Sequence, residues 1–233
     1  LGAATMLTTS ADTPPELRRK VTSPAGTTHA AITHMESGGA AMLIQDAVIA
    51  VEDQTFWSND GVDLNATMRA FLKNLTSGEI EQGGSTITQQ LVKNRILSKK
   101  RDINRKVREI ILALRLNEKY SKREILEQYL NTVYFGNGAY GIKAASEVYF
   151  GKQPLEVTLP EAALLAGLIA APVDYDPVRH PGRSERRRNH VLSLMLGLGM
   201  IDQAEFEEAS ALPIVRRLAP DDLNGSRAHV RML

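Results

Sequence analysis

The chain has 233 residues, of which 43% are hydrophobic and 24% are charged, and its net charge is +1. This composition is ordinary for a globular protein, and it excludes a wholly disordered chain or a multi-span membrane protein. The sequence has no cysteine, which excludes disulfides, thiolate zinc sites and cysteine nucleophiles. Its longest apolar run, residues 162–173, is shorter than the roughly 20 residues that a membrane-spanning helix needs.

From residue 44 onward, apolar residues recur at helical spacing, whereas residues 1–40 are rich in Thr, Ala and Gly and predict a weakly structured N-terminal segment. Two pairs, Thr158 with Glu161 and Asp202 with Glu205, have capping-box spacing. Three glycines and an asparagine predict a loop over residues 136–141. No alternating strand pattern is clear, so the predicted fold class is mainly α. The expected helices cover residues 44–51, 65–72, 86–97, 103–114, 122–131, 142–150, 159–171 and 186–196, and another begins at Asp202.

Positive charge is concentrated in the middle of the chain. Residues 93–123 contain twelve lysines and arginines but only three acidic residues. A local basic block indicates a polyanionic partner: a nucleic acid, a phosphate group or an anionic membrane. The alternative is a solvated helix face, and the charge pattern alone does not separate these interpretations.

Glu52 lies at the border of the first apolar stripe, four residues after Val48. Partial burial raises the pKa of a carboxylate and makes it a better proton acceptor. The neighbouring Asp53 adds negative charge, which acts in the same direction. Glu52 is therefore a candidate general base, and the alternative is that both acids end a helix as solvated residues.

Residues 83–94, GGSTITQQLVKN, begin with two glycines, which allow a backbone to approach a ligand closely. Thr86 and Gln89 have the spacing of a capping box. One helical face carries only hydrogen-bonding groups and a single cation, from Thr86, Gln89, Gln90 and Lys93. Such a face suits a sugar or phosphate near a helix N-terminus. The alternative is a capped surface helix with a polar face.

Residues 99–109 carry a row of cations. Arg101, Arg105 and Glu109 recur every four residues and share one helical stripe, which Lys106 and Arg108 flank. Several arginines together suit a pyrophosphate, because each guanidinium binds phosphate oxygens in pairs. Glu109 is either a second working carboxylate beside a phosphate or a bound metal, or simply the i, i+4 partner of Arg105.

Together these stretches resemble the ordered motifs of the family 51 glycosyltransferases, which form the polymerase domain of class A penicillin-binding proteins and of monofunctional peptidoglycan glycosyltransferases. The similarity covers residues 45–200, and five motifs in order are far more specific than any one. Where the family usually has His, this chain has Asn59, which forms hydrogen bonds but does not titrate. The motifs correspond to Glu52, Asp53, Phe56, Asn59 and Gly61; to residues 83–94; to Arg105, Lys106 and Glu109; to residues 122–152; and to residues 159–177, with Arg187, Arg188 and Asn189 following.

The resemblance implies a lysozyme-like fold with a helical head lobe and a small jaw lobe that meets the membrane surface. The domain would cover residues 41–211, with the jaw at residues 64–82 and a C-terminal connector over residues 212–233. The implied location is the extracytoplasmic face of the cell membrane. The chain has neither a Ser-x-x-Lys nor a Lys-Thr-Gly stretch, so a transpeptidase would belong to another domain or partner of the parent protein.

The implied reaction joins lipid II to a growing glycan strand through a β-1,4 link, with inversion and release of undecaprenyl pyrophosphate. Glu52 is the expected general base, and Glu109 is expected to work beside the pyrophosphate, with a divalent cation such as Mg²⁺ or Mn²⁺ as an open option. No nucleic acid partner is expected, because no aromatic stacking residues alternate with the cations. The residues expected to bind substrate are Asp53, Phe56, Ser85, Thr86, Gln89, Gln90, Lys93, Arg101, Arg105, Lys106 and Arg108.

Two other functions stay open at this point. A lysozyme-like hydrolase would cleave glycan instead of building it, although such an enzyme has no pyrophosphate for the basic cluster to neutralise. A binding module would hold lipid II without turnover, and only the Asn at position 59 favours it.

Overall fold

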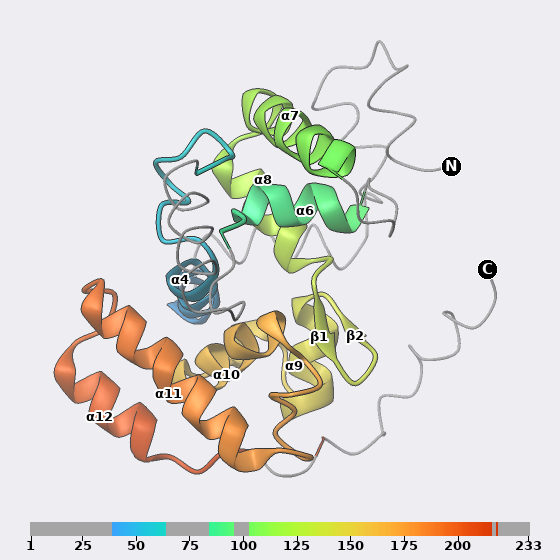
Figure 1. The fold of residues 1–233 in the computed structure, drawn as a ribbon. Helices are drawn as coiled ribbons and strands as arrows, with labels where there is room; N and C mark the ends of the chain where they lie inside the picture. Colours follow the sequence, from blue (N-terminus) through green and yellow to red (C-terminus); the bar gives the residue numbers. More distant parts are fainter. Residues whose placement is uncertain (1–38, 64–83, 96–102, 216–217, 219–233) are drawn as a thin grey trace, which may run out of the picture. The chain divides into compact units, whose positions relative to one another are not determined.

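The computed structural model describes residues 39–63, 84–95, 103–215 and 218. They fall into two compact units, and α4 (Gly39–Glu52) contributes its first part to one unit and its last part to the other (Figure 1). Residues 1–38 of the predicted N-terminal segment, the predicted jaw at residues 64–82 and Arg101 lie outside the described residues, whereas residues 39 and 40 belong to α4.

The first unit contains the end of α4 together with α6 (Ile87–Arg95), α7 (Ile103–Lys119) and α8 (Lys122–Leu130). Helix α6 packs against both α7 and α8. Its apolar side chains Ile87, Leu91 and Val92 are buried, as the helical spacing of these residues predicts. Helix α8 begins at a reciprocal capping box between Ser121 and Glu124, which satisfies backbone N–H groups at its first turn.

The second unit is built around α10 (Leu159–Ala170), whose residues 162–168 are all buried. Helix α10 packs against α11 (Pro181–Gly197), α12 (Gln203–Ala211) and the strand β1 (Tyr134–Gly136). The unit also contains β2 (Ala139–Tyr140), α9 (Ile142–Phe150) and the short 3₁₀ helix η1 (Pro154–Glu156). A helix with such a long apolar run is the expected centre of a helical core.

The prediction of a loop over residues 136–141 is partly wrong, because β1 and β2 form a short antiparallel hairpin there. Asn137 and Gly138 connect the strands with positive φ angles of 47° and 76°. An Asn-Gly pair with two positive φ angles is typical of the tight turn that joins two twisted strands. The strands are too short for an alternation of apolar and polar residues to be visible in the sequence. The Asn137-Gly138 pair was the sequence feature that could have indicated a hairpin.

The mainly α prediction is confirmed for the described part of the chain, and so are two predicted helix starts. The carboxylate of Glu161 accepts a hydrogen bond from the Thr158 backbone N–H, and Asp202 and Glu205 bond reciprocally. The predicted helix over residues 186–196 begins earlier, at Pro181, a residue suited to a first helical turn. Among the described helices, none has the length and apolar character to cross a bilayer.

Candidate active site

Two hydrogen bonds connect the predicted general base, Glu52, to the side chains of Gln90 and Tyr129. Glu52 is the last residue of α4 and is partly buried. The Gln90 side-chain amide, in the first turns of α6, donates from Nε2 to Oε2 of Glu52 at 2.8 Å. The Tyr129 hydroxyl, on α8, donates to Oε1 of Gln90 at 2.8 Å. Three helices thus meet at the Glu52 carboxylate.

Tyr129 is a site residue that the sequence analysis missed, because its place in an apolar stripe of α8 marks it as core. Tyr129 is indeed fully buried, but its hydroxyl donates a hydrogen bond to the polar side chain of Gln90. Burial raises the pKa of Tyr129 well above its ordinary value, and the negative charges of Glu52 and Asp53 act in the same direction. The phenol therefore keeps its proton and donates it to Gln90.

Asp53 is buried and holds the loop after α4 against the start of α6. Its carboxylate accepts hydrogen bonds from the Ile87 backbone N–H at 3.1 Å and from the Asn59 amide at 3.0 Å and 3.2 Å. Ile87 is the first residue of α6, so Asp53 supplies one of the acceptors that a helix N-terminus lacks. Burial raises the pKa of Asp53, against the opposing effects of its hydrogen bonds and of Lys122. The contacts described are with protein groups, and substrate binding by Asp53 stays a prediction.

Asn59, the residue that departs from the family pattern, uses both ends of its amide. Its Nδ2 donates to Asp53, while its Oδ1 accepts from the Gly61 N–H and from the Lys122 ammonium, each at 2.9 Å. These bonds hold the loop without any titrating group at position 59. The role described by these contacts is structural support of the loop.

Phe56 is fully buried beneath Lys122, whose Nζ lies 5.0 Å from the ring centroid. This geometry is a cation–π contact. Trp57, which the sequence analysis did not single out, packs edge-on against Phe56 and is half exposed. The accessible aromatic surface of this loop therefore belongs to Trp57, and substrate contact by Phe56 stays a prediction.

The predicted capping box at the start of α6 is confirmed. The Thr86 backbone N–H donates to Oε1 of Gln89 at 2.9 Å, and the Gln89 N–H donates to the Thr86 hydroxyl at 3.1 Å. The same hydroxyl donates to the Gly61 carbonyl at 2.6 Å. Both side chains are buried, so much of the predicted polar face joins α6 to the loop before it, while Lys93 is exposed.

The predicted phosphate-binding stripe contains an ion pair between Lys106 and Glu109. The Lys106 ammonium lies 2.5 Å from Oε1 of Glu109 and donates to the Ser85 hydroxyl at 3.1 Å. Glu109 is buried, whereas the Lys106 side chain keeps 39% of its surface exposed. Arg105 is partly buried and Arg108 is exposed. This arrangement brings Lys106 and Glu109 together at Ser85, the residue before the α6 capping box.

A divalent cation finds no built site in the described part of the chain. No three His, Asp or Glu side chains there gather closely enough to hold a metal ion. The Glu109 carboxylate already has the Lys106 ammonium as its counter-charge. The described residues therefore offer no three-residue ligand set for a metal ion, and a divalent cation beside Glu109 stays a prediction.

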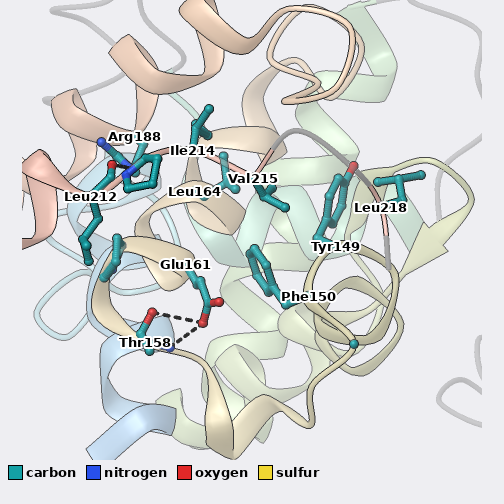
Figure 2. Close-up of a pocket in the computed structure, with 13 residues that line it drawn as sticks. Tyr149, Phe150, Thr158, Glu161, Leu164, Arg188, Leu212, Ile214, Val215 and Leu218 are labelled. Carbon is teal, nitrogen blue, oxygen red and sulfur yellow. Dashed lines mark hydrogen bonds between the residues drawn. The ribbon is translucent and has the colours of Figure 1, made fainter. Parts of the chain in front are cut away.

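A separate cavity of about 780 Å³ lies in the second unit, between α9, α10, α11 and the segment after α12 (Figure 2). Its polar side chains are engaged within the protein: Glu161 binds Thr158 and Lys152, and Arg188 binds backbone carbonyls. None of the predicted site residues lines it. The cavity therefore offers no chemistry that competes with the site at Glu52.

Comparison with known sequences decides the family: the transglycosylase profile matches residues 21–196. The chain belongs to the transglycosylase family. It is a glycosyltransferase domain, as the motifs predict.

Several known proteins are similar to this chain over most of its length. Penicillin-binding protein 1A of Aquifex aeolicus is 48% identical over 169 residues, which are 72% of this chain and 23% of that protein. Penicillin-binding protein 2a of Streptococcus pneumoniae is 44% identical over 186 residues, 80% of this chain and 25% of that protein. A Cupriavidus necator protein that carries a transglycosylase name is 43% identical over 168 residues, which are 72% of each chain. The chain thus spans about a quarter of the length of the penicillin-binding relatives.

Proposed function

We propose that this transglycosylase domain polymerises lipid II into β-1,4-linked glycan strands at the extracytoplasmic face of the cell membrane. One observation carries the proposal: hydrogen bonds through Gln90 and Ser85 connect the candidate base, Glu52, to a candidate phosphate-binding cation, Lys106. Gln90 Nε2 binds Glu52 and also lies 3.4 Å from the Ser85 carbonyl, while the Ser85 hydroxyl accepts from Lys106. A sugar transfer with a pyrophosphate leaving group needs both functions within reach of one substrate.

In the proposed reaction, Glu52 takes the proton from the 4-hydroxyl of the acceptor's GlcNAc. That oxygen forms a bond to the anomeric carbon of the donor's MurNAc as the bond from this carbon to the pyrophosphate oxygen breaks. The attack from the opposite side converts an α link into a β link, which is the geometry of an inverting displacement. The undecaprenyl pyrophosphate leaves with the electron pair.

Lys106 is the leading candidate to neutralise the leaving pyrophosphate. Glu109 fixes its ammonium from the protein side, while more than a third of the Lys106 side chain stays accessible. Arg105, Arg108, Lys93 and Arg101 would add further positive charge, and Gln89, Thr86 and Ser85 would position the substrate. Preorganised cations of this kind stabilise a developing negative charge without reorganising at the moment of reaction.

The contacts of Asn59 weaken the case for an inactive binding module. Its amide gives Asp53 a donor and gives Gly61 and Lys122 an acceptor, so the loop keeps its supports without a histidine. The growing strand and the membrane surface are the proposed partners. A transpeptidase domain or partner in the parent protein is proposed by analogy with the penicillin-binding relatives.

The test is glycan polymerisation from labelled lipid II in detergent or vesicles, with wild type, Glu52→Gln and the control Glu118→Gln. Glu118 is an exposed carboxylate on α7. We expect strands from wild type and from the control, and none from Glu52→Gln, which should still bind lipid II. Wild type that binds lipid II yet makes no glycan would instead support the binding module. Release of reducing ends from finished peptidoglycan would support the hydrolase.

A further inference from the structure

We propose that Tyr129 is a positioning residue for the general base, because it fixes which end of the Gln90 amide faces Glu52. This inference rests on the proposed function, in which Glu52 takes a proton. The Tyr129 hydroxyl lies 2.8 Å from Oε1 of Gln90, and Nε2 of Gln90 lies 2.8 Å from Oε2 of Glu52. Tyr129 itself is fully buried, so its side chain presents no surface to a ligand in solution.

The two ends of a glutamine amide have similar shapes but opposite hydrogen-bonding characters. With Nε2 toward Glu52, an N–H donor meets a carboxylate. If the amide rotated by half a turn, its carbonyl oxygen would face that carboxylate, and two acceptors would oppose each other. Two acceptors, the Glu52 carboxylate and the Ser85 carbonyl, lie on the Nε2 side of Gln90. The Tyr129 hydroxyl adds a donor on the Oε1 side, which stabilises the productive orientation further.

Tyr129 is suited to this task because its environment keeps the phenol protonated. Burial raises its pKa well above the ordinary value, and the nearby Glu52 and Asp53 charges add to this effect. The hydroxyl therefore remains a donor at every pH at which the enzyme would work. Helix α8 holds the ring in the core of the first unit, so the donor is fixed in space.

The oriented Gln90 amide has two effects on the base. It holds the Glu52 carboxylate in one position, and it stabilises the ionised form, because a hydrogen bond to a charged group favours that charge. Loss of the bond should lower kcat and raise the pKa of the base. The other charged groups of the site include Asp53 beside Glu52, Lys122 over Phe56, and Lys106 and Glu109, which reach Ser85 from α7. Tyr129→Phe and Gln90→Met leave all of these groups in place.

The test compares Tyr129→Phe with Tyr149→Phe, which removes the hydroxyl of another fully buried tyrosine, in the second unit. We expect kcat of Tyr129→Phe to fall about tenfold with KM nearly unchanged. The acidic limb of its pH–kcat profile should move to higher pH. Tyr149→Phe should keep the wild-type kcat and pH–kcat profile when the rate is divided by the amount of folded protein. A Tyr129→Phe enzyme with wild-type kcat and pH profile would overturn the proposal.

Gln90→Met supplies a second test, because a double-mutant cycle with Tyr129→Phe separates an effect that passes through Gln90 from any other effect of Tyr129. Removing the same amide should lower kcat and shift the acidic limb in the same direction. In the Gln90→Met background, Tyr129→Phe should have no further effect on kcat, because both changes break one chain. Additive losses would contradict the proposal. If wild type makes no glycan, or Glu52→Gln still does, the proposed function fails instead.

Discussion

The Oδ1 atom of Asn59 accepts a hydrogen bond from the Lys122 ammonium, 63 residues further along the chain, at 2.9 Å. Lys122 also lies over the ring of buried Phe56. Burial lowers the pKa of the Lys122 ammonium, whereas the negative charges of Asp53 and Asp60 raise it by less. A neutral amide can accept from this cation and donate to Asp53 at the same time. Position 59 therefore joins the loop after α4 to α8 without contributing a charge.

Asn59→Ala should remove all of these contacts and leave Asp53 with fewer donors. We expect the free energy of unfolding to fall by about 1–3 kcal/mol, since a buried carboxylate loses hydrogen bonds. Polymerisation should fall as well, because the loop follows directly on Glu52 at the end of α4. Denaturant unfolding and lipid II turnover measure the two effects. Asn94→Ala, at an exposed site on α6, is the control, and an Asn59→Ala variant that matched it in both assays would contradict the supporting role.

Gly61 occupies a position where a side chain does not fit. Its φ angle is 90°, and an added Cβ would lie 2.8 Å from the Ala113 carbonyl oxygen and 3.0 Å from Cβ of Asn117. Gly61→Ala should therefore lower the free energy of unfolding by about 2–4 kcal/mol through strain and overlap. Gly138→Ala is a matched control, with a φ of 76° but open space around it, and should cost only about 1 kcal/mol. Equal losses in urea unfolding would show that the contact with α7 does not matter.

The ion pair between Lys106 and Glu109 should respond asymmetrically to mutation. Glu109→Gln leaves a lysine that can turn to water, so the free energy of unfolding should change by less than about 1 kcal/mol. Lys106→Met leaves a buried carboxylate without its partner and should cost about 3 kcal/mol. Both should reduce polymerisation at least tenfold, because both disturb the cation at Ser85. Thermal unfolding that ranked the two variants in the opposite order would contradict this account.

Tyr149 should make the second unit sensitive to alkaline pH. Burial raises its pKa to about 12, and its hydroxyl donates to the Phe135 carbonyl. A raised folded-state pKa gives stability that is complete below pH 10 and is lost as pH rises toward 12. The shift corresponds to about 3 kcal/mol. Denaturant unfolding should show that, between pH 9 and pH 12, the free energy of unfolding falls by about 3 kcal/mol more in wild type than in Tyr149→Phe. Parallel curves for the two proteins would contradict the assignment.

The residues of the site show which features the sequence could predict. Thr86 and Gln89 are three positions apart, so local spacing was enough to predict their capping box. Glu109 was placed on the basic stripe, but spacing suggested Arg105 as its partner, whereas its ion pair is with Lys106. Both partners are compatible with a helix, and Lys106 also binds Ser85, a contact from outside the helix that spacing within the helix does not reveal.

The chain from Tyr129 through Gln90 to Glu52 was beyond sequence reasoning for a different reason. Its hydrogen bonds join residues 38 and 39 positions apart, on three helices. Helical periodicity indicates which face of each helix is buried but not which faces meet. A buried tyrosine in an apolar stripe gives one weak signal, since its hydroxyl needs a partner.

The buried guanidinium of Arg188 sets a limit on how short a folded fragment of this protein can be. It donates to the Leu212 carbonyl at 2.7 Å and to the Ser210 carbonyl at 2.9 Å, and Ile214 is buried just beyond. A recombinant fragment cut after residue 211 would lack the Leu212 carbonyl, one of the two backbone acceptors of this buried guanidinium, and the buried side chain of Ile214. Expression boundaries should therefore include at least residue 214, a few positions beyond the edge that the motifs alone suggest.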